Sequence, residues 1–392
     1  MKLLFLSNYY PFPVYADGAT VRVFHLLKEM SKRADVEYVY IGDTSGLTNE
    51  DLEGLKSLKV PFHFVSIRNT RNIQSVAKKI FSEKRFYSKD AVNKIALIVE
   101  KVKPDIIFCE QPFSAALVGK VKVPVYVSSV DCSSLAAKKA SMRVTSSLID
   151  RVVSRYICHQ RSRFEKKYLN DANGVSVVAQ EDADVLGALI KKPVDVIPNG
   201  VDFNKFNAPG YHADGKFVLF TGNLSSRSSM NEEAALFLIS KSSDLFKKTG
   251  KKTRIAGRAP SNRILQACQE CRYVELMPDL ENMESAFEDV FLYVCPVIYG
   301  TGIKNTVLQA ASMGVPCLIT TLVADPAEFE DGISAFIDND RERWPDLIVN
   351  FDREKLMLVG ENGKTHITSN FTWENISDHH LRRLQEIIDL PL

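Results

Sequence analysis

The segment Tyr299–Thr321, with the sequence YGTGIKNTVLQAASMGVPCLITT, indicates how this chain folds. Its Gly-Thr-Gly turn at 300–302 is followed by apolar residues at helical spacing. Gly314 suits the residue that follows the end of a helix, and a strand is predicted over Cys317–Thr320. A loop, a helix and a strand in this order are typical of an α/β domain.

The start of this predicted helix is a candidate site for an anion. A glycine-rich turn that leads into a helix presents unpaired backbone N–H groups and the positive end of the helix dipole. Here Gly302, Ile303 and Asn305 supply the backbone, and Lys304 adds a positive charge. These residues fit a diphosphate, although a plain connection between elements of an α/β domain has the same pattern.

Short apolar runs rich in Val and Ile alternate with helical segments along the chain. Such runs are expected of strands that are buried on both faces of a parallel sheet. The other predicted strands are Lys2–Ser7, Val36–Ile41, His63–Ile67, Asp105–Cys109, Val123–Ser128, Val175–Ala179, Asp195–Ile197, Phe217–Phe220, Thr253–Ala256, Val274–Leu276 and Phe291–Val294. A linker rich in turn signals, Asn199–Lys216, separates two series, which predicts two doubly wound α/β domains with a ligand cleft between them.

Composition excludes several classes of protein. The 392 residues suffice for roughly two or three domains, and a net charge of +2 argues against a general nucleic-acid binder. Seven scattered cysteines indicate a reducing compartment rather than a disulfide framework. The N-terminal apolar run is too short for a signal peptide, and no run is long enough to span a membrane. We therefore expect a cytoplasmic protein.

Three segments resemble retaining family-4 glycosyltransferases, the glycosyl transferases group 1. Tyr299–Thr321 is similar to their nucleotide-sugar signature, a Gly-x-Gly loop, a lysine and a helix ending in A-x-G-x-P. Val196–Asp202, VIPNGVD, resembles the segment where their first domain ends. Ser7–Gly18, SNYYPFPVYADG, followed by Arg22, resembles their N-terminal loop. The three matches occur in the family's order along nearly the whole chain.

The resemblance implies the GT-B fold, in which two Rossmann-like domains face each other across a cleft. It places an acceptor-side domain at 1–205, a nucleotide-sugar-binding domain at 206–372, and a C-terminal helix at 373–392 that crosses back to the first domain. The implied reaction moves a sugar from a nucleotide-sugar to a glycan, lipid-linked or protein acceptor. It retains configuration and needs neither a metal nor a cofactor besides the nucleotide-sugar. Polysaccharide assembly at the bacterial surface is the implied setting.

The donor side departs from the family in two places. Thr301 and Gln309 stand where the family carries two glutamates, and Gln309 can still bind a ribose hydroxyl through its carbonyl. The stretch after Gly222 offers Arg227 as its only cation, where the family has two. Arg258, which follows a strand, is a further phosphate candidate or else an ordinary surface arginine. Lys304 is the residue we expect to stabilise the leaving diphosphate, with backbone help from Gly18 of the first domain.

The acceptor side has no histidine after the strand that ends at Cys109. Glu110 stands there and is the candidate for orienting the acceptor hydroxyl or stabilising charge on the sugar. A solvated loop glutamate is the alternative. Asp17, Arg22, Gln111 and Asp131 are further acceptor-side candidates by their place after predicted strands or in the N-terminal loop.

Two basic stretches fall in the predicted acceptor domain. Lys138–Lys167 holds nine Lys or Arg against two acidic residues, and Arg68–Lys89 holds seven against one. They suit anionic lipid headgroups at the inner face of the cell membrane, or else they are solvated helix faces. The motif Asp338-Asn-Asp340 spells a metal-binding D-x-D, but it lies far from the diphosphate loop, so no metal site is expected.

Two other functions remain open. A GT-B chain that has lost its chemistry and supports a partner would explain Thr301, Gln309 and the few cations after Gly222. A sugar-nucleotide epimerase also binds a sugar diphosphate between Rossmann-like domains. Release of nucleotide only in the presence of an acceptor distinguishes a transferase from both.

Overall fold

The structure is a computed structural model that describes residues 1–15, 17–67, 89–118, 121–142, 148–206, 211–226 and 228–390. Arg227 and most of the basic stretch Arg68–Lys89 lie outside the described residues. The chain divides into two compact units. Unit 1 comprises Met1–Asn199 and Trp373–Leu392, and unit 2 comprises Gly200–Thr372, so unit 1 ends before the predicted residue 205.

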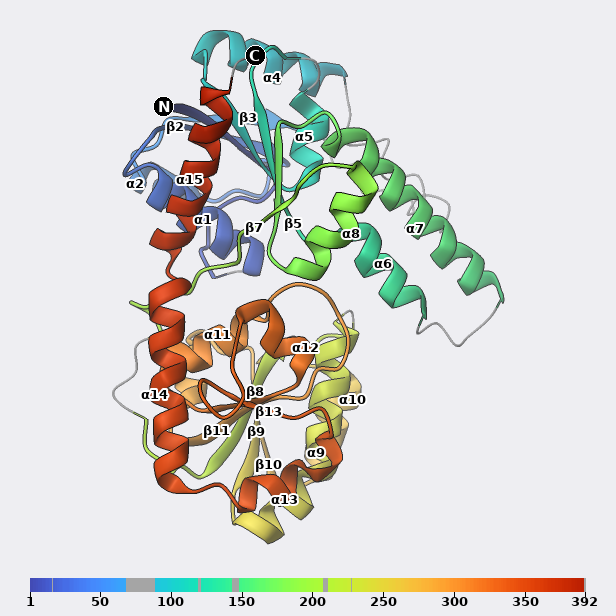
Figure 1. Ribbon diagram of the computed structural model, residues 1–392, viewed down its shortest axis with the longest axis vertical. Coiled ribbons are helices and arrows are strands. Elements are labelled where there is room, and N and C mark those ends of the chain that lie inside the picture. The colour runs from blue at the N-terminus through green and yellow to red at the C-terminus, as the bar shows by residue number, and fades with distance from the viewer. Residues whose placement is uncertain are drawn as a thin grey trace. The chain divides into compact units, whose positions relative to one another are not determined.

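Unit 1 is built on a parallel sheet with the strand order β3-β2-β1-β4-β5-β6-β7 (Figure 1). Its strands are β1 (Lys2–Ser7), β2 (Asp35–Gly42), β3 (Phe62–Ser66), β4 (Ile106–Glu110), β5 (Val125–Val130), β6 (Gly174–Val177) and β7 (Asp195–Val196). Its helices are α1 (Gly18–Met30), α2 (Asn49–Ser57), α4 (Lys89–Val102), α5 (Pro112–Val118), α6 (Ser133–Met142), α7 (Leu148–Leu169), α8 (Gln180–Ile190) and α15 (Trp373–Asp389).

Both faces of this sheet are buried. Side chains of a strand point to alternate faces, so Leu4 and Leu6 of β1 enter one apolar cluster while Leu3 and Phe5 enter another. Helix α15 contributes Trp373 and other apolar residues to the second cluster, and it packs against α1 (Figure 1). The C-terminal helix therefore completes the core of unit 1, although it follows unit 2 in sequence.

Unit 2 has a second parallel sheet, with the order β10-β9-β8-β11-β12-β13. Its strands are β8 (Phe217–Asn223), β9 (Lys252–Arg258), β10 (Val274–Pro278), β11 (Val290–Cys295), β12 (Cys317–Ile319) and β13 (Phe336–Ile337). Its α-helices are α9 (Ser229–Thr249), α10 (Asn262–Gln269), α11 (Asn305–Ser312), α12 (Thr321–Ala324), α13 (Trp344–Val349) and α14 (Arg353–Asn370), and its 3-10 helices are η2 (Met283–Phe287), η3 (Asp325–Ala327) and η4 (Arg341–Arg343). Together the two units confirm the predicted α/β architecture with two parallel, doubly wound sheets.

The strand order places one switch point in each unit. In unit 1 the order reverses between β1 and β4, and in unit 2 it reverses between β8 and β11. Ligands of open α/β sheets bind beyond the carboxyl ends of the strands at such points. We therefore expect ligands at the loops after β1, β4, β8 and β11.

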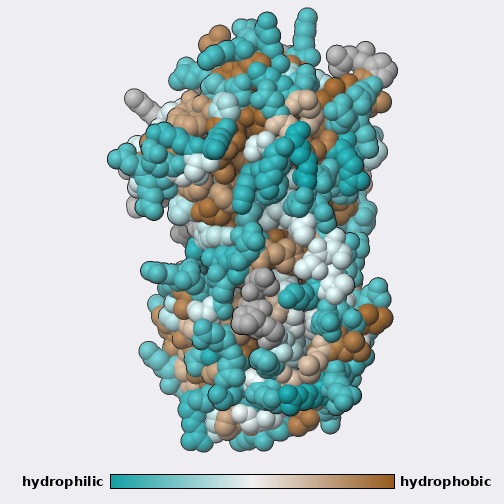
Figure 2. All heavy atoms as spheres, turned by 90° about the vertical axis from the view of Figure 1, so that its left-hand side faces the viewer, coloured by the Kyte–Doolittle hydropathy of each residue, from teal (hydrophilic) through white to brown (hydrophobic). Residues whose placement is uncertain are grey.

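The surface of the molecule is largely polar. On the face that Figure 2 shows, hydrophilic side chains are the most widespread. In the described part of the chain no helix combines the length and apolarity needed to cross a bilayer.

Candidate active site

The glycine-rich loop of unit 2 links β11 to α11 in a conformation that requires glycine. Gly300 has φ of 127° and Gly302 has φ of 68°, values that side chains other than glycine rarely adopt. Lys304 is the N-cap of α11, and its Nζ donates a hydrogen bond of 2.9 Å to the carbonyl of Thr301. The ammonium group is thereby held over the loop, next to the first turn of the helix.

Two contacts that the sequence did not reveal fix this loop to the rest of unit 2. The hydroxyl of Tyr299 donates a 2.9 Å hydrogen bond to Oε1 of Glu233 on α9. A Cβ added at Gly300 would lie 2.9 Å from Sδ of Met230, which shows how closely α9 approaches the loop. Beneath it, Tyr293 of β11 is fully buried and hydrogen-bonds Oγ1 of Thr221 at 3.2 Å.

The other donor-side candidates lie on neighbouring elements of unit 2. Arg258 ends β9, is exposed, and pairs in register with Asn223 at the end of β8. Gln309 lies in the second turn of α11 and is partly exposed, as are Thr301 and Ile303. The structure thus places Arg258 at the carboxyl edge of the sheet, the same edge that leads into the loop after β11.

This arrangement suits an anion. The loop and Lys304 lie at the switch point between β8 and β11, where backbone N–H groups at the start of α11 face the ligand position of an open sheet. The nearby Cys295 thiol is not an alternative reactive group, because burial raises its pKa to about 11 even though Lys304 lowers it.

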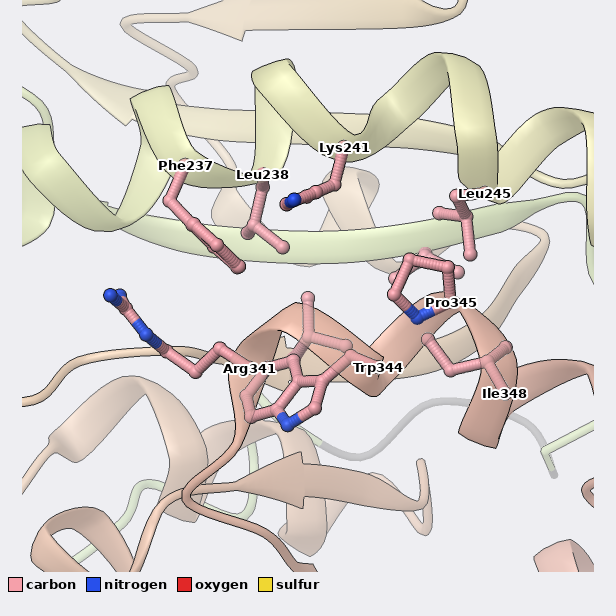
Figure 3. Close-up of a pocket in the computed structure, with 10 residues that line it drawn as sticks. Phe237, Leu238, Lys241, Leu245, Arg341, Trp344, Pro345 and Ile348 are labelled. Atoms are coloured by element: carbon pink, nitrogen blue, oxygen red, sulfur yellow. The ribbon is translucent and has the colours of Figure 1, made fainter.

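A separate crevice in unit 2 lies between α9 and α13 (Figure 3). Phe237, Leu238 and Leu245 of α9 point toward Trp344 and Ile348, and the space has room for about one water-sized molecule, 20 Å³. None of the predicted site residues lines it. Its apolar walls are those of helix packing, so we do not assign a nucleotide to it.

The D-x-D motif is engaged in structural contacts. Oδ2 of Asp338, which is 7% exposed, accepts hydrogen bonds from Nε of Arg343 at 2.7 Å and from its Nη2 at 2.6 Å. The backbone N–H of Asp340 donates to the other carboxylate oxygen of Asp338 at 2.7 Å. The carboxylate therefore closes the turn that leads into η4. Over the described residues, no group of three or more His, Cys, Asp or Glu side chains could hold a metal ion.

In unit 1 a buried ion pair occupies the switch point between β1 and β4. Nε of Arg22 on α1 donates to Oε1 of Glu110 at 2.8 Å, with the two side chains 3% and 2% exposed. The same guanidinium donates to Oδ1 of Asn199 at 2.6 Å, to Oγ of Ser128 at 2.8 Å and to Nε2 of His380 at 3.3 Å. Sequence reasoning did not identify Asn199, Ser128 or His380 as site residues, although each lies in a segment that it had described.

Burial shifts the pKa values of this network. It raises the pKa of Glu110 more than the Arg22 charge lowers it, and it lowers the pKa of His380 far below the ordinary value, with the Arg22 charge acting in the same direction. We expected Glu110 and Arg22 on the acceptor side of the site. In unit 1 their charges are buried against each other and hold its elements together, and a role of Glu110 toward an acceptor stays a prediction.

The remaining acceptor-side candidates lie closer to the surface. Asp17 is the exposed N-cap of α1, and its Oδ1 accepts from the backbone N–H of Ala19 at 2.9 Å and of Thr20 at 2.8 Å. Gly18 is the first residue of that helix and is exposed. Gln111 and Asp131 follow β4 and β5 and are partly exposed, and Gln111 has φ of 77°.

Both units match glycosyltransferase families. Residues 16–205 match Glycosyltransferase Family 4, and residues 215–352 match Glycosyl transferases group 1. No curated protein matches this chain.

Solved structures of glycosyltransferases share the whole fold. Sucrose-phosphate synthase from Thermosynechococcus elongatus is 13% identical, with 98% of each chain covered and a TM-score of 0.72. HepE from Anabaena in complex with UDP and glucose is 12% identical, with 98% of this chain and 100% of that chain covered and a TM-score of 0.68. A mutant of TarM from S. aureus in complex with Fondaparinux, alpha-GlcNAc-glycerol and UDP is 15% identical, with 99% and 100% covered and a TM-score of 0.68. With its two units matched to the two domains of this family and its fold shared along the whole chain, the protein belongs to the group 1, family-4 glycosyltransferases of the GT-B fold.

Proposed function

We propose that this glycosyltransferase moves a sugar from a UDP-sugar to a hydroxyl group of a glycan or lipid-linked acceptor, with retention of configuration and without a metal ion. The resemblance to the retaining family supports the stereochemistry. The choice of UDP follows from HepE and TarM, each of which is similar in fold and was solved with UDP. Polysaccharide assembly in the cytoplasm is the setting that the resemblance implies.

The observation that carries the proposal is the geometry of the loop at 300–305. Its two glycines adopt positive φ, so the backbone can approach a ligand closely, and Lys304 caps the helix that follows. When the glycosidic bond to the diphosphate breaks, negative charge develops on the leaving phosphate oxygen. Preorganised N–H groups and an ammonium group stabilise such charge without reorganisation.

The first test is binding of the donor. We expect UDP and a UDP-sugar to raise the melting temperature of the protein more than GDP, ADP, TDP or CMP do. Lys304→Ala should weaken this stabilisation, while Lys247→Ala, an exposed lysine of α9, should leave it unchanged. If another nucleotide stabilises the protein most, that nucleotide and not UDP belongs to the donor. If UDP stabilises Lys304→Ala as much as the wild type, the diphosphate does not bind at this loop.

The second test is the reaction. A proton NMR time course with the preferred donor reports the configuration of the product, and we expect the same anomer as in the donor, at the same rate with EDTA. Formation of the opposite anomer or loss of activity with EDTA would contradict the proposal.

A non-catalytic binding protein is the second candidate, because Thr301 and Gln309 replace two glutamates of the family. It would bind the donor and release no nucleotide with any acceptor. An epimerase would instead convert the UDP-sugar without any acceptor, so the same NMR series separates all three functions.

A further inference from the structure

Helix α7 carries a series of basic side chains. Arg151, Arg155, His159, Arg163 and Lys167 follow one another at intervals of four residues, and all are exposed. Residues four apart are neighbours on a helix surface, so at 1.5 Å per residue the row extends over about 24 Å and turns gradually about the helix axis. These residues, with the exposed Lys166, form what we call the basic face.

Acidic residues are few among the described side chains of this helix. Between residues 151 and 169 the one acidic residue is Glu165, which is fully buried. Its Oε1 accepts from Oγ of Ser133 at 2.8 Å and from the backbone N–H of Ser134 at 3.2 Å, both at the start of α6. Like charges four residues apart repel each other and destabilise a helix. Arg151 with Arg155, and Arg163 with Lys167, are such pairs, and an anionic partner would offset their repulsion.

Exposed apolar side chains occur on α7 and on the neighbouring helix α6. Val152 is 67% exposed, and its position in the helix places it among Arg155, His159 and Arg163. Met142, at the end of α6, is 71% exposed, and α6 packs along α7 (Figure 1). A soluble polyanion would contact the charges only. The surface of an anionic bilayer accommodates both, because headgroups bind the cations while apolar side chains enter the boundary with the acyl chains.

We infer that the basic face of α7, with Val152 and Met142, docks on the surface of an anionic lipid bilayer. The helix lies along the surface, with the guanidinium and ammonium groups against lipid phosphates and with Val152 and Met142 turned into the interface. Attachment of this kind is reversible and depends on ionic strength.

Sedimentation of the full chain with lipid vesicles tests the charges. We expect binding to vesicles of phosphatidylglycerol mixed with phosphatidylcholine, and little binding to phosphatidylcholine alone. Neutralising three residues of the face, Arg155→Gln, Arg163→Gln and Lys167→Gln together, should weaken binding about 100-fold, since each basic residue near the surface contributes roughly fivefold. The control neutralises three exposed lysines elsewhere, Lys101→Gln, Lys247→Gln and Lys252→Gln, and should bind like the wild type.

Two results would overturn the inference: equal loss of binding in both triple variants, or no preference of the wild type for anionic vesicles. Far-UV circular dichroism and melting temperature verify that both variants fold, and glutamine keeps the helix propensity high.

A second pair of measurements separates a bilayer from a soluble polyanion. Val152→Ser with Met142→Ser should weaken binding to anionic vesicles and leave retention on heparin unchanged. If vesicle binding is unaffected and soluble heparin abolishes it, the face binds polyanionic chains rather than a bilayer.

Discussion

Arg22 and Glu110 form a buried ion pair with 2.8 Å between Nε and Oε1. The guanidinium also binds Asn199, the last residue of unit 1 before the chain enters unit 2, and His380 of α15, which follows the return of the chain. One side chain of α1 therefore contacts both segments of unit 1 that join it to unit 2. Among the described side chains that bind it, Glu110 is the one with a negative charge, since Asn199 and Ser128 are neutral acceptors.

Glu110→Gln should strongly destabilise unit 1. The substitution leaves the Arg22 charge buried without a counter-charge, which costs about 3–5 kcal/mol of the free energy of unfolding when a partner is removed from a buried pair. Urea denaturation followed by circular dichroism measures the loss.

The control is the exposed pair between Arg33, in the turn after α1, and Glu374 of α15, with side chains 36% and 63% exposed. Glu374→Gln should cost about 0–1 kcal/mol. Equal losses for the two substitutions would mean that Glu110 does not compensate the Arg22 charge in solution.

The buried His380 predicts a loss of stability in mild acid. Its folded pKa lies far below the ordinary value of about 6.5, so between those two values the unfolded chain binds a proton that the folded chain does not. The contribution of His380 to the free energy of unfolding is therefore complete above about pH 6.5. It falls as the pH is lowered, by up to about 1.4 kcal/mol per pH unit. Glu110, whose pKa is raised, has the opposite effect on stability as the pH falls. The test therefore compares variants with the wild type and does not interpret the pH dependence of the wild type alone.

The measurement is the free energy of unfolding between about pH 7 and pH 5 for the wild type and His380→Gln. The variant should lose less stability over this range, and His159→Gln, at an exposed position, should follow the wild type. Identical slopes for the wild type and His380→Gln would show that the histidine titrates normally in the folded protein.

Most of the fold followed from local pattern. Each predicted strand coincides with an observed one, because strands buried on both faces are continuous apolar runs that the sequence displays directly. The strand β13 was missed, since Phe336–Ile337 is only two residues long and has no periodicity to detect. The glycine at 314 marked a true helix end, with α11 ending at Ser312 and Gly314 at φ of 76°.

The contacts of the candidate site were harder to predict from the sequence, because the residues that contact each other there are distant in the chain. The glycine-rich loop was found from its own residues, whereas Glu233, which binds Tyr299, lies 66 positions away and carries no local signal. Glu110 was placed correctly at the end of a strand, but its burial depends on Arg22, 88 positions away. Side chains that pair across elements become visible only when the topology brings them together.

Asp338→Ala should lower stability without affecting the donor. Its carboxylate accepts hydrogen bonds from Arg343 and from the backbone of Asp340, both exposed, and loss of such a hydrogen bond costs about 0.5–1.5 kcal/mol. We expect the donor dissociation constant to stay within about twofold by calorimetry, and to be the same with Mg²⁺ or EDTA, since a factor of two is only about 0.4 kcal/mol. Donor binding that requires Mg²⁺ in the wild type and is lost in the variant would show that D-x-D holds a metal ion.

Gly257→Ala should disrupt the carboxyl edge of the sheet in unit 2. A Cβ at Gly257 would lie 1.8 Å from the carbonyl oxygen of Gly222 on the neighbouring strand, and backbone cannot rotate away as a side chain can. Overpacking of this kind costs about 1–3 kcal/mol or more, and separation of β8 from β9 would also displace Arg258.

The control is Gly46→Ala, where an added Cβ meets nothing within 4 Å, with an expected change within about 0.5 kcal/mol. We expect Gly257→Ala to lower both the melting temperature and the affinity for the donor. A variant as stable as the control would show that β8 and β9 can separate without loss, and normal donor affinity in a destabilised variant would place Arg258 outside the donor site.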